Sequence, residues 1–215
     1  IVGIWNLDRS PLDKEELDRF TDSLAHRGPD GRGTYFDSAT KLGLGHRRLS
    51  ILDISAAGDQ PMSYANKRYW IVYNGEVYNF LELRKELVGL GYTFSSQSDT
   101  EVVLAAYIQW GEDCQHRFNG MWAIAIWDGH KLFLCRDRLG QKPLFYRFTG
   151  SSIEFASEIK AILAHPGIDK TRDDTAIYDY LTYGYIPSPK TPYKKIRKLE
   201  AAHTFTFRRD LSHYS

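Results

Sequence analysis

Hydrophobic residues along the chain gather in short runs rich in β-branched and aromatic side chains, a pattern typical of strands. We predict strands over residues 1–5, 42–46, 69–73, 121–127, 132–136 and 144–148. The run at 122–127, Trp-Ala-Ile-Ala-Ile-Trp, is apolar at every position. Because a strand with one face in water alternates apolar and polar residues, this run indicates a sheet covered on both faces. The pattern therefore predicts a layered core.

A helical period appears between these runs. Phe80, Leu83, Leu87 and Leu90 recur at helical spacing, and Gly91 stands where a C-terminal cap belongs. The spacing predicts one amphipathic helix ending near residue 90.

A second helix is predicted over residues 102–110. Ser98 and Glu101 form a capping box in front of it, and Gly111 ends the run. Three more helices are expected over residues 13–25, 157–163 and 173–183, with connections rich in Gly and Pro, such as 28–31, between the elements. Helices and strands together indicate an α+β protein.

Length and charge narrow the class of protein. With 215 residues and 42% hydrophobic content, the chain is large enough for one well-buried domain. The 28 basic residues nearly balance the 27 acidic ones, so we expect no nucleic-acid partner. No apolar run approaches the roughly 20 residues that span a bilayer, and residues 1–9 lack the pattern of a secretory signal. We therefore expect a cytoplasmic protein with no membrane partner.

Four polar segments carry more specific side chains than a structural loop needs: 26–30 (His-Arg-Gly-Pro-Asp), 48–52 (Arg-Leu-Ser-Ile-Leu), 73–76 (Tyr-Asn-Gly-Glu) and 98–101 (Ser-Asp-Thr-Glu). With 118–121 (Phe-Asn-Gly-Met), 136–140 (Arg-Asp-Arg-Leu-Gly), 142–144 (Lys-Pro-Leu) and 155–160 (Phe-Ala-Ser-Glu-Ile-Lys), they extend over nearly the whole chain. In this order the segments resemble the class II glutamine amidotransferases, and within them the glutamine-hydrolysing asparagine synthetases. The resemblance implies the N-terminal nucleophile hydrolase fold, a four-layer αββα sandwich of two antiparallel sheets.

The resemblance also implies a site for L-glutamine. Arg48 would bind the α-carboxylate, because a guanidinium fork matches a carboxylate with two hydrogen bonds. Asp99 and Glu76 would bind the α-ammonium, since a cation that leaves water needs fixed anionic acceptors. The pocket would be lined by Leu49, Ser50, Ile51 and Leu52.

Asn74 and Gly75 would form the oxyanion hole for the tetrahedral intermediate on the way to a thioester. The Asn side-chain amide and the Gly N–H converge on one oxygen, and we expect glycine here because it permits an unusual backbone angle. An Asn-Gly pair that follows a strand most often forms a hairpin turn, and this is the competing interpretation of Asn74 and Gly75.

Other candidates have structural interpretations. Asp99 would complement the helix dipole, and Arg48 beside Arg47 would be a solvated basic pair. We favour an ion-pair network around a turn for residues 136–138. His26 and His46 are expected to be buried hydrogen-bonding residues, because no metal-ligand spacing accompanies them. We predict no metal site.

The nucleophile of this family is an N-terminal cysteine whose own α-amine acts as the base. Residue 1 is Ile, so two registers arise. In the favoured one, Ile1-Val2-Gly3 matches the Ile-x-Gly of the family's opening Cys-Gly-Ile-x-Gly, and the cysteine stands two places upstream. In the other, Val2 replaces the cysteine. We expect a polypeptide that starts at Ile1 not to hydrolyse glutamine.

Neither internal cysteine is a candidate nucleophile. Cys114 follows the second predicted helix and Cys135 lies in a predicted strand. A small buried thiol is the ordinary interpretation of both, because a reactive thiol needs an electropositive, partly exposed setting.

The resemblance implies a division of the chain. Residues 1–186 would be the glutaminase domain. Pro187, Pro189 and Pro192 among several basic residues indicate that 187–215 form an extended connection. It would lead to a C-terminal synthetase domain that uses ATP and Mg²⁺ through a Ser-Gly-Gly-x-Asp-Ser loop, a motif that does not occur here.

We accordingly expect no cofactor in this domain, and a homodimer is a candidate assembly. The expected function is release of ammonia from glutamine for ATP-dependent amidation of aspartate. Two alternatives stay open: an amidotransferase domain serving a different acceptor, and a non-catalytic relative, with Val2 in place of the cysteine, acting as a binding module. An N-terminal nucleophile hydrolase for other amides is disfavoured, because Arg48 and Asp99 suit a free amino acid.

Overall fold

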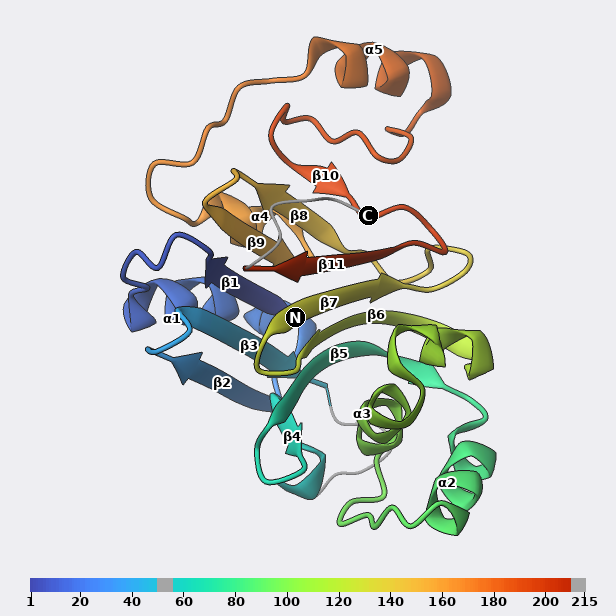
Figure 1. Cartoon of the computed structure of the whole chain (residues 1–215). Helices are drawn as coiled ribbons and strands as arrows, with labels where there is room; N and C mark the ends of the chain where they lie inside the picture. The colour runs from blue at the N-terminus through green and yellow to red at the C-terminus, as the bar shows by residue number, and fades with distance from the viewer. Residues whose placement is uncertain (50–55, 210–215) are drawn as a thin grey trace.

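The computed structural model describes residues 1–49 and 56–209, which form two antiparallel sheets (Figure 1). The six-stranded sheet has the order β10-β8-β9-β1-β3-β2. Its strands are β1 (Val2–Asn6), β2 (Gly31–Asp37), β3 (Leu42–Arg48), β8 (Phe145–Phe148), β9 (Ser152–Ala156) and β10 (Arg197–Lys198). The five-stranded sheet has the order β11-β7-β6-β5-β4. Its strands are β4 (Met62–Tyr64), β5 (Tyr69–Val77), β6 (Gly120–Trp127), β7 (Lys131–Arg136) and β11 (Thr204–Arg208).

Helices lie on the outer faces of both sheets. The helices α1 (Lys14–Asp22) and α4 (Ile159–Leu163) pack on the six-stranded sheet, while α3 (Asp99–Trp110) packs on the other and α2 (Phe80–Gly89) packs against α3. Short 3₁₀ helices are η1 (Ala25–Arg27), η2 (Ala56–Gly58) and η3 (Gly111–Arg117). The helix α5 (Asp174–Tyr183) stands apart from the sandwich, beyond β10 (Figure 1).

Three hydrophobic clusters separate the four layers. Along β1, Val2 and Ile4 belong to the cluster under α1 and α4, whereas Ile1 and Trp5 belong to the cluster between the sheets. A third cluster lies between β5, β6 and α3. Successive strand residues face opposite sides, so both faces of each sheet are buried. The predicted αββα sandwich of two antiparallel sheets is confirmed.

All six predicted strands are present, and five more were not predicted: β2, β4, β9, β10 and β11. The missed strands β4 and β10 are only three and two residues long, and β2 contains two glycines and two charged residues, so their local pattern is weak. The strand β5 runs four residues past its prediction, to Val77, and pairs with β6 throughout, with Gly75 opposite Trp122. The hairpin interpretation of Asn74-Gly75 is therefore wrong.

All five predicted helices are present, with Asp13, Ser98 and Asp173 as N-caps. Only one of the two hydrogen bonds of the predicted capping box forms. Ser98 caps α3 by accepting a hydrogen bond from the N–H of Thr100, but the Glu101 carboxylate does not turn back to Ser98. It accepts the N–H groups of Ser95 and Ser96 at 3.0 and 2.8 Å.

Residues 187–209 do more than lead out of the domain. They supply β10, which pairs with β8, and β11, which pairs with β7, so they contribute one edge strand to each sheet. A boundary at residue 186 would remove a strand from both sheets. In the described ranges no helix is long and apolar enough to cross a membrane.

Candidate functional site

One cavity of about 250 Å³ opens where the two sheets meet the N-terminus of α3. Side chains from distant parts of the sequence line it. They include Ile1 before β1, His46 and Arg48 on β3, Asn74 and Gly75 on β5, and Asp99 on α3.

The structure therefore brings together five of the residues that the sequence singled out: Arg48, Leu49, Asn74, Gly75 and Asp99 all line this cavity. Glu76 is not among the lining residues, although it lies close enough to Asp99 for its charge to raise the pKa of that carboxyl. Three expected pocket residues, Ser50, Ile51 and Leu52, lie outside the described residues.

Arg48 is not a solvated surface residue. Its side chain is only 11% exposed, and Nη1 donates a hydrogen bond of 2.7 Å to Oδ1 of Asp59. Its neighbour Arg47 is also largely buried, and its Nε donates to the Gly28 carbonyl at 3.1 Å. The interpretation as a solvated basic pair is wrong, and β3 holds the Arg48 guanidinium at the cavity wall.

Asp99 is the first residue of α3, which begins three residues before the predicted helix, and its carboxylate does more than complement the helix dipole. Oδ2 accepts hydrogen bonds from the Tyr73 hydroxyl at 2.9 Å and from the Val77 N–H at 3.0 Å. Burial raises the pKa of Asp99, and these two hydrogen bonds oppose that rise because they favour the ionised form. A carboxylate is thus anchored to β5 at the cavity edge.

Asn74 and Gly75 lie side by side on the wall formed by β5. The Asn74 amide nitrogen is buried and has no hydrogen-bond partner in the part of the chain that the structure describes. Such a buried donor is costly unless a ligand uses it.

Gly75 does not have the unusual backbone angle that we expected, since its φ is outside the left-handed region. Glycine is required by close packing instead. A Cβ at this position would lie 2.2 Å from the Met121 carbonyl oxygen and 2.8 Å from Trp122 Cα.

His46 and His26, the two histidines expected to be buried, differ in their exposure. His46 is buried as expected, lines the cavity and is hydrogen-bonded to the Tyr73 backbone. Burial lowers its pKa to about 3, with help from the charges of the N-terminal amine and Arg48, so His46 is neutral at neutral pH. His26 is exposed, against our expectation.

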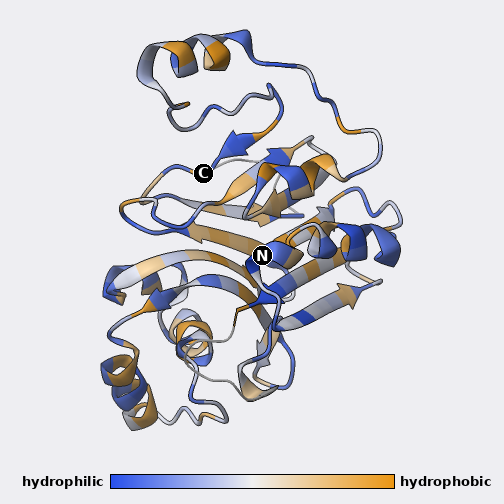
Figure 2. Cartoon of the chain, turned by 180° about the vertical axis from the view of Figure 1, so that it is seen from behind, coloured by the Kyte–Doolittle hydropathy of each residue, from blue (hydrophilic) through white to orange (hydrophobic). Residues whose placement is uncertain are grey.

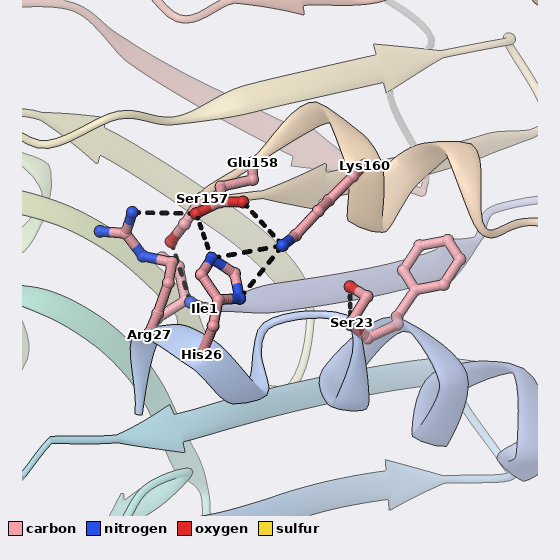
Figure 3. A network of polar contacts seen from close by, with 8 residues as sticks. Ile1, Ser23, His26, Arg27, Ser157, Glu158 and Lys160 are labelled. Atoms are coloured by element: carbon pink, nitrogen blue, oxygen red, sulfur yellow. Dashed lines mark hydrogen bonds and ion pairs between the residues drawn. The ribbon is translucent and has the colours of Figure 1, made fainter. Parts of the chain in front are cut away.

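His26 belongs to a polar network around Glu158 (Figure 3). His26 Nε2 and Arg27 Nη1 both lie 3.0 Å from Oε1 of Glu158, and Lys160 Nζ lies 3.3 Å from Oε2. Burial alone would raise the pKa of Glu158, but the hydrogen bonds from Arg27, His26 and Lys160 lower it overall. The network adjoins the start of β1, where the Ile1 nitrogen donates to Oγ of Ser157 at 2.9 Å.

Among the cavity residues that sequence reasoning did not assign to the site are Arg27, Gln60 and Lys142. Arg27 and Lys142 lie in motifs that carried the resemblance, so their position could have been anticipated. Gln60 had no such signal. Its Oε1 accepts the Tyr73 N–H at 2.6 Å and its Nε2 lies 3.3 Å from Oγ1 of Thr100, so it joins β5 to α3 beneath the cavity.

Residues 136–138 are structural, as we favoured, but they do not form the ion-pair network we expected. The Arg136 guanidinium donates to the carbonyls of Lys142, Leu199 and Gly140, and Arg138 donates to other backbone carbonyls. The buried Asp137 accepts backbone N–H groups, including those of Lys142 and of Trp122, the partner of Gly75 in the sheet. These contacts support the strand that carries the cavity wall.

Cys114 and Cys135 are both buried, and burial raises the pKa of each thiol, that of Cys135 to about 12. They are inert core thiols, as expected. Within residues 1–49 and 56–209, no group of three or more His, Cys, Asp or Glu residues is arranged to hold a metal ion.

Residues 1–214 match the family model described as the glutamine amidotransferase domain. The chain belongs to this family. This amidotransferase domain is 45% identical, over 92% of its length, to asparagine synthetase [glutamine-hydrolyzing] 3 of Bacillus subtilis, and 40% identical, over 97%, to asparagine synthetase [glutamine-hydrolyzing] 1 of the same organism. It spans 33% of the length of each relative.

The amidotransferase domain also shares its fold with a solved structure, the glutamine phosphoribosylpyrophosphate amidotransferase of B. subtilis. The two superpose with a TM-score of 0.70 over 97% of this chain and 47% of the other, at 19% identity. This likeness confirms the N-terminal nucleophile hydrolase fold.

Proposed function

We propose that this domain hydrolyses L-glutamine to glutamate and ammonia as the glutaminase part of an asparagine synthetase. The observation that carries the proposal is the single cavity on which Arg48, Asp99, Asn74 and Gly75 converge from three different elements. An amino acid offers one anionic end, one cationic end and a side chain, and the cavity offers a matching group for each.

The charged groups suit the two ends of free glutamine. The Arg48 guanidinium is held at the wall and would bind the α-carboxylate by two hydrogen bonds. The Asp99 carboxylate, fixed by Tyr73 and Val77, would bind the α-ammonium. Glu76 would act on the ammonium only through its charge, because it does not line the cavity.

The geometry of β1 supports a cysteine two places before Ile1. Val2 lies opposite Gly45 in the antiparallel pair, so continuing the register sets a residue two places before Ile1 beside Arg48. Strand side chains alternate, and that residue would therefore point to the same side as Ile1, toward the cavity.

The alternative register puts the nucleophile's position at Val2. The Val2 side chain is fully buried in the cluster under α1 and α4, and it does not line the cavity. A cysteine at that position would face the helices. The non-catalytic module with Val2 in the nucleophile's place therefore finds no support in this geometry.

The reaction follows from these positions. The cysteine thiol, deprotonated by its own α-amine, would attack the carboxamide carbon, and the Asn74 amide and Gly75 N–H would stabilise the oxyanion. The amine would return the proton to the leaving nitrogen, which departs as ammonia and leaves a thioester. Water then cleaves the thioester to glutamate and regenerates the thiol.

The remainder of the protein is part of the same proposal. Both B. subtilis relatives are about three times as long as this chain and are named glutamine-hydrolysing asparagine synthetases. A synthetase domain after residue 215 would use ATP and Mg²⁺ to activate aspartate and would receive the ammonia. We place the whole enzyme in the cytoplasm, where its nucleotide substrate is made.

Glutamate release by the full-length protein tests the function. A protein whose mature chain begins Cys-Gly before Ile1 is expected to release glutamate from glutamine, and replacing that cysteine with alanine should abolish release. A matched protein confirmed to begin at Ile1 should be inactive. Glutamate release by the Ile1 form would contradict the assignment of the nucleophile.

A further inference from the structure

The helix α5 and the turn after it expose an unusual concentration of large apolar side chains. Five of them lie within residues 178–185, and their exposed fractions run from 54% for Tyr180 to 77% for Leu181; the others are Tyr178, Tyr183 and Tyr185. In the whole ten-residue helix only Ala176 is buried. Figure 2 shows hydrophobic segments on this helix, which stands away from the layered core.

The exposure is not a sign of a poorly formed helix. Asp173 caps the N-terminus by accepting from the N–H groups of Thr175 and Ala176, and Gly184, with φ +76°, caps the C-terminus. Asp179 Oδ2 forms an ion pair with Lys190 Nζ at 2.7 Å, and this contact fixes the helix to the loop that follows it. A capped, anchored helix thus presents tyrosines and a leucine to solvent.

Large exposed apolar side chains gathered on one element mark interaction surfaces, and tyrosine is among the residues most enriched where proteins bind one another. We propose that the exposed surface of α5 and of the turn after it, which carries Tyr178, Tyr180, Leu181, Tyr183 and Tyr185, docks against the part of the same polypeptide that follows residue 215. The inference rests on the proposed function, because it takes the full protein to contain a synthetase domain there.

The length of the relatives argues for this occupant. About two-thirds of each B. subtilis relative lies outside the part matched by this chain. A partner tethered in the same polypeptide has an effective concentration in the millimolar range, so a small surface is sufficient. A ten-residue helix is about 15 Å long. It offers far less than the roughly 800 Å² per partner that stable complexes of separate proteins bury, which disfavours a second copy.

Tyrosine footprinting of the full-length protein tests the surface directly. The probe is iodination of tyrosine rings, read by mass spectrometry at each residue. Tyr78, which lies in the connection between β5 and α2 and is 53% exposed, is the internal control. We expect Tyr178 and Tyr183 to react at least fivefold more slowly than Tyr78, although both are more exposed than Tyr78 in this structure.

Three results would overturn the proposal. One is equal reaction of Tyr178, Tyr183 and Tyr78 in the full-length protein. Another is protection that disappears on dilution in step with dissociation of a dimer, which would assign the surface to a second copy. A native reading frame with no domain after residue 215 would also overturn it.

A second experiment measures function in the same full-length protein. The double variant Tyr178→Ser, Leu181→Ser should release glutamate at the wild-type rate but convert severalfold less of the ammonia into asparagine. The control variant Leu81→Ser removes another exposed apolar side chain, 62% exposed on α2, and should transfer ammonia normally. Unchanged transfer in the double variant would contradict docking through α5.

The footprinting and the activity assay distinguish a failure of this inference from a failure of the proposed function. If the wild-type protein released no glutamate, the proposed function would fail, while the footprint would still decide whether α5 is covered.

Discussion

The Tyr73 hydroxyl donates a 2.9 Å hydrogen bond to the Asp99 carboxylate across 26 positions of sequence. It joins β5 of the five-stranded sheet to the first turn of α3, and both residues are buried. The Asp99 carboxylate therefore has a fixed place relative to Asn74 and Gly75, which follow Tyr73 on β5. In the proposed function this relationship fixes the distance between the carboxylate that binds the ammonium of glutamine and the two groups that face its amide.

Removing that hydrogen bond should weaken substrate binding. In Tyr73→Phe, Asp99 loses its side-chain donor and keeps backbone donors, and a hydrogen bond to a charged group contributes about 1.5–3 kcal/mol. We expect the KM for glutamine to rise at least tenfold with kcat little changed, measured by glutamate release from the full-length enzyme. Tyr64→Phe is the control, because its hydroxyl bonds the exposed Thr93 carbonyl. An unchanged KM in Tyr73→Phe would contradict the role of Asp99.

The shape of the Arg48 guanidinium should matter as much as its charge. Arg48→Lys keeps the charge but loses the two-pronged grip on a carboxylate, so we expect kcat/KM for glutamine to fall about tenfold or more. Arg68→Lys, at an exposed position, should leave kcat/KM unchanged. If a lysine at position 48 supported normal kinetics, the α-carboxylate would have to bind elsewhere.

Replacing Asn74 should lower kcat and hardly change the stability of the fold. Loss of one oxyanion donor costs roughly 3 kcal/mol of transition-state stabilisation, so Asn74→Ala is expected to lower kcat about 100-fold or more. Because the buried Asn74 nitrogen has no partner among the described residues, the free energy of unfolding should change little. Chemical denaturation measures the second quantity. A fall in stability without loss of kcat would assign Asn74 to the fold instead.

Gly75 should tolerate no side chain. In Gly75→Ala, the new Cβ would lie 2.2 Å from the Met121 carbonyl oxygen, so the β5–β6 pairing must shift. We expect a loss of about 1–3 kcal/mol in the free energy of unfolding. Gly89→Ala is the control, because nothing lies within 4 Å of a Cβ there and alanine favours a helix. Comparable stability of the two variants would contradict the steric argument.

His46 should make stability depend on pH. Its pKa is about 3 in the folded protein and about 6.5 in the unfolded chain. Between these values the unfolded state binds the extra proton, so the free energy of unfolding falls as pH drops below 6.5.

At pH 5, protonation of His46 in the unfolded chain lowers the free energy of unfolding by about 2 kcal/mol. The reason is that pH 5 lies about 1.5 units below the pKa of His46 in the unfolded chain. Denaturation of the polypeptide starting at Ile1, measured between pH 7 and pH 5, should show this loss. In His46→Gln the loss should be smaller by about that amount. Parallel pH dependence of the two proteins would show that His46 is protonated without cost.

Local patterns in the sequence were enough to predict the layers. The runs at 42–46 and 121–127 became interior strands because strand residues buried on both faces are mostly apolar whatever their partners. Ser98, Asp173, Gly91 and Gly111 mark helix ends through short-range hydrogen bonds and positive φ angles. Such signals act within a few residues, and the chain carries them wherever it folds.

What the sequence could not determine was which distant groups meet. Glu101 bonds Ser95 and Ser96 because the preceding loop folds back on α3, and β10 and β11 exist only because β8 and β7 leave open edges for them. The meeting of Arg48, Asn74 and Asp99 at one cavity likewise depends on β3, β5 and α3 packing together. Residue types and local spacing determined the elements, whereas long-range packing decided the cavity, because contacts between remote segments leave no local periodicity to read.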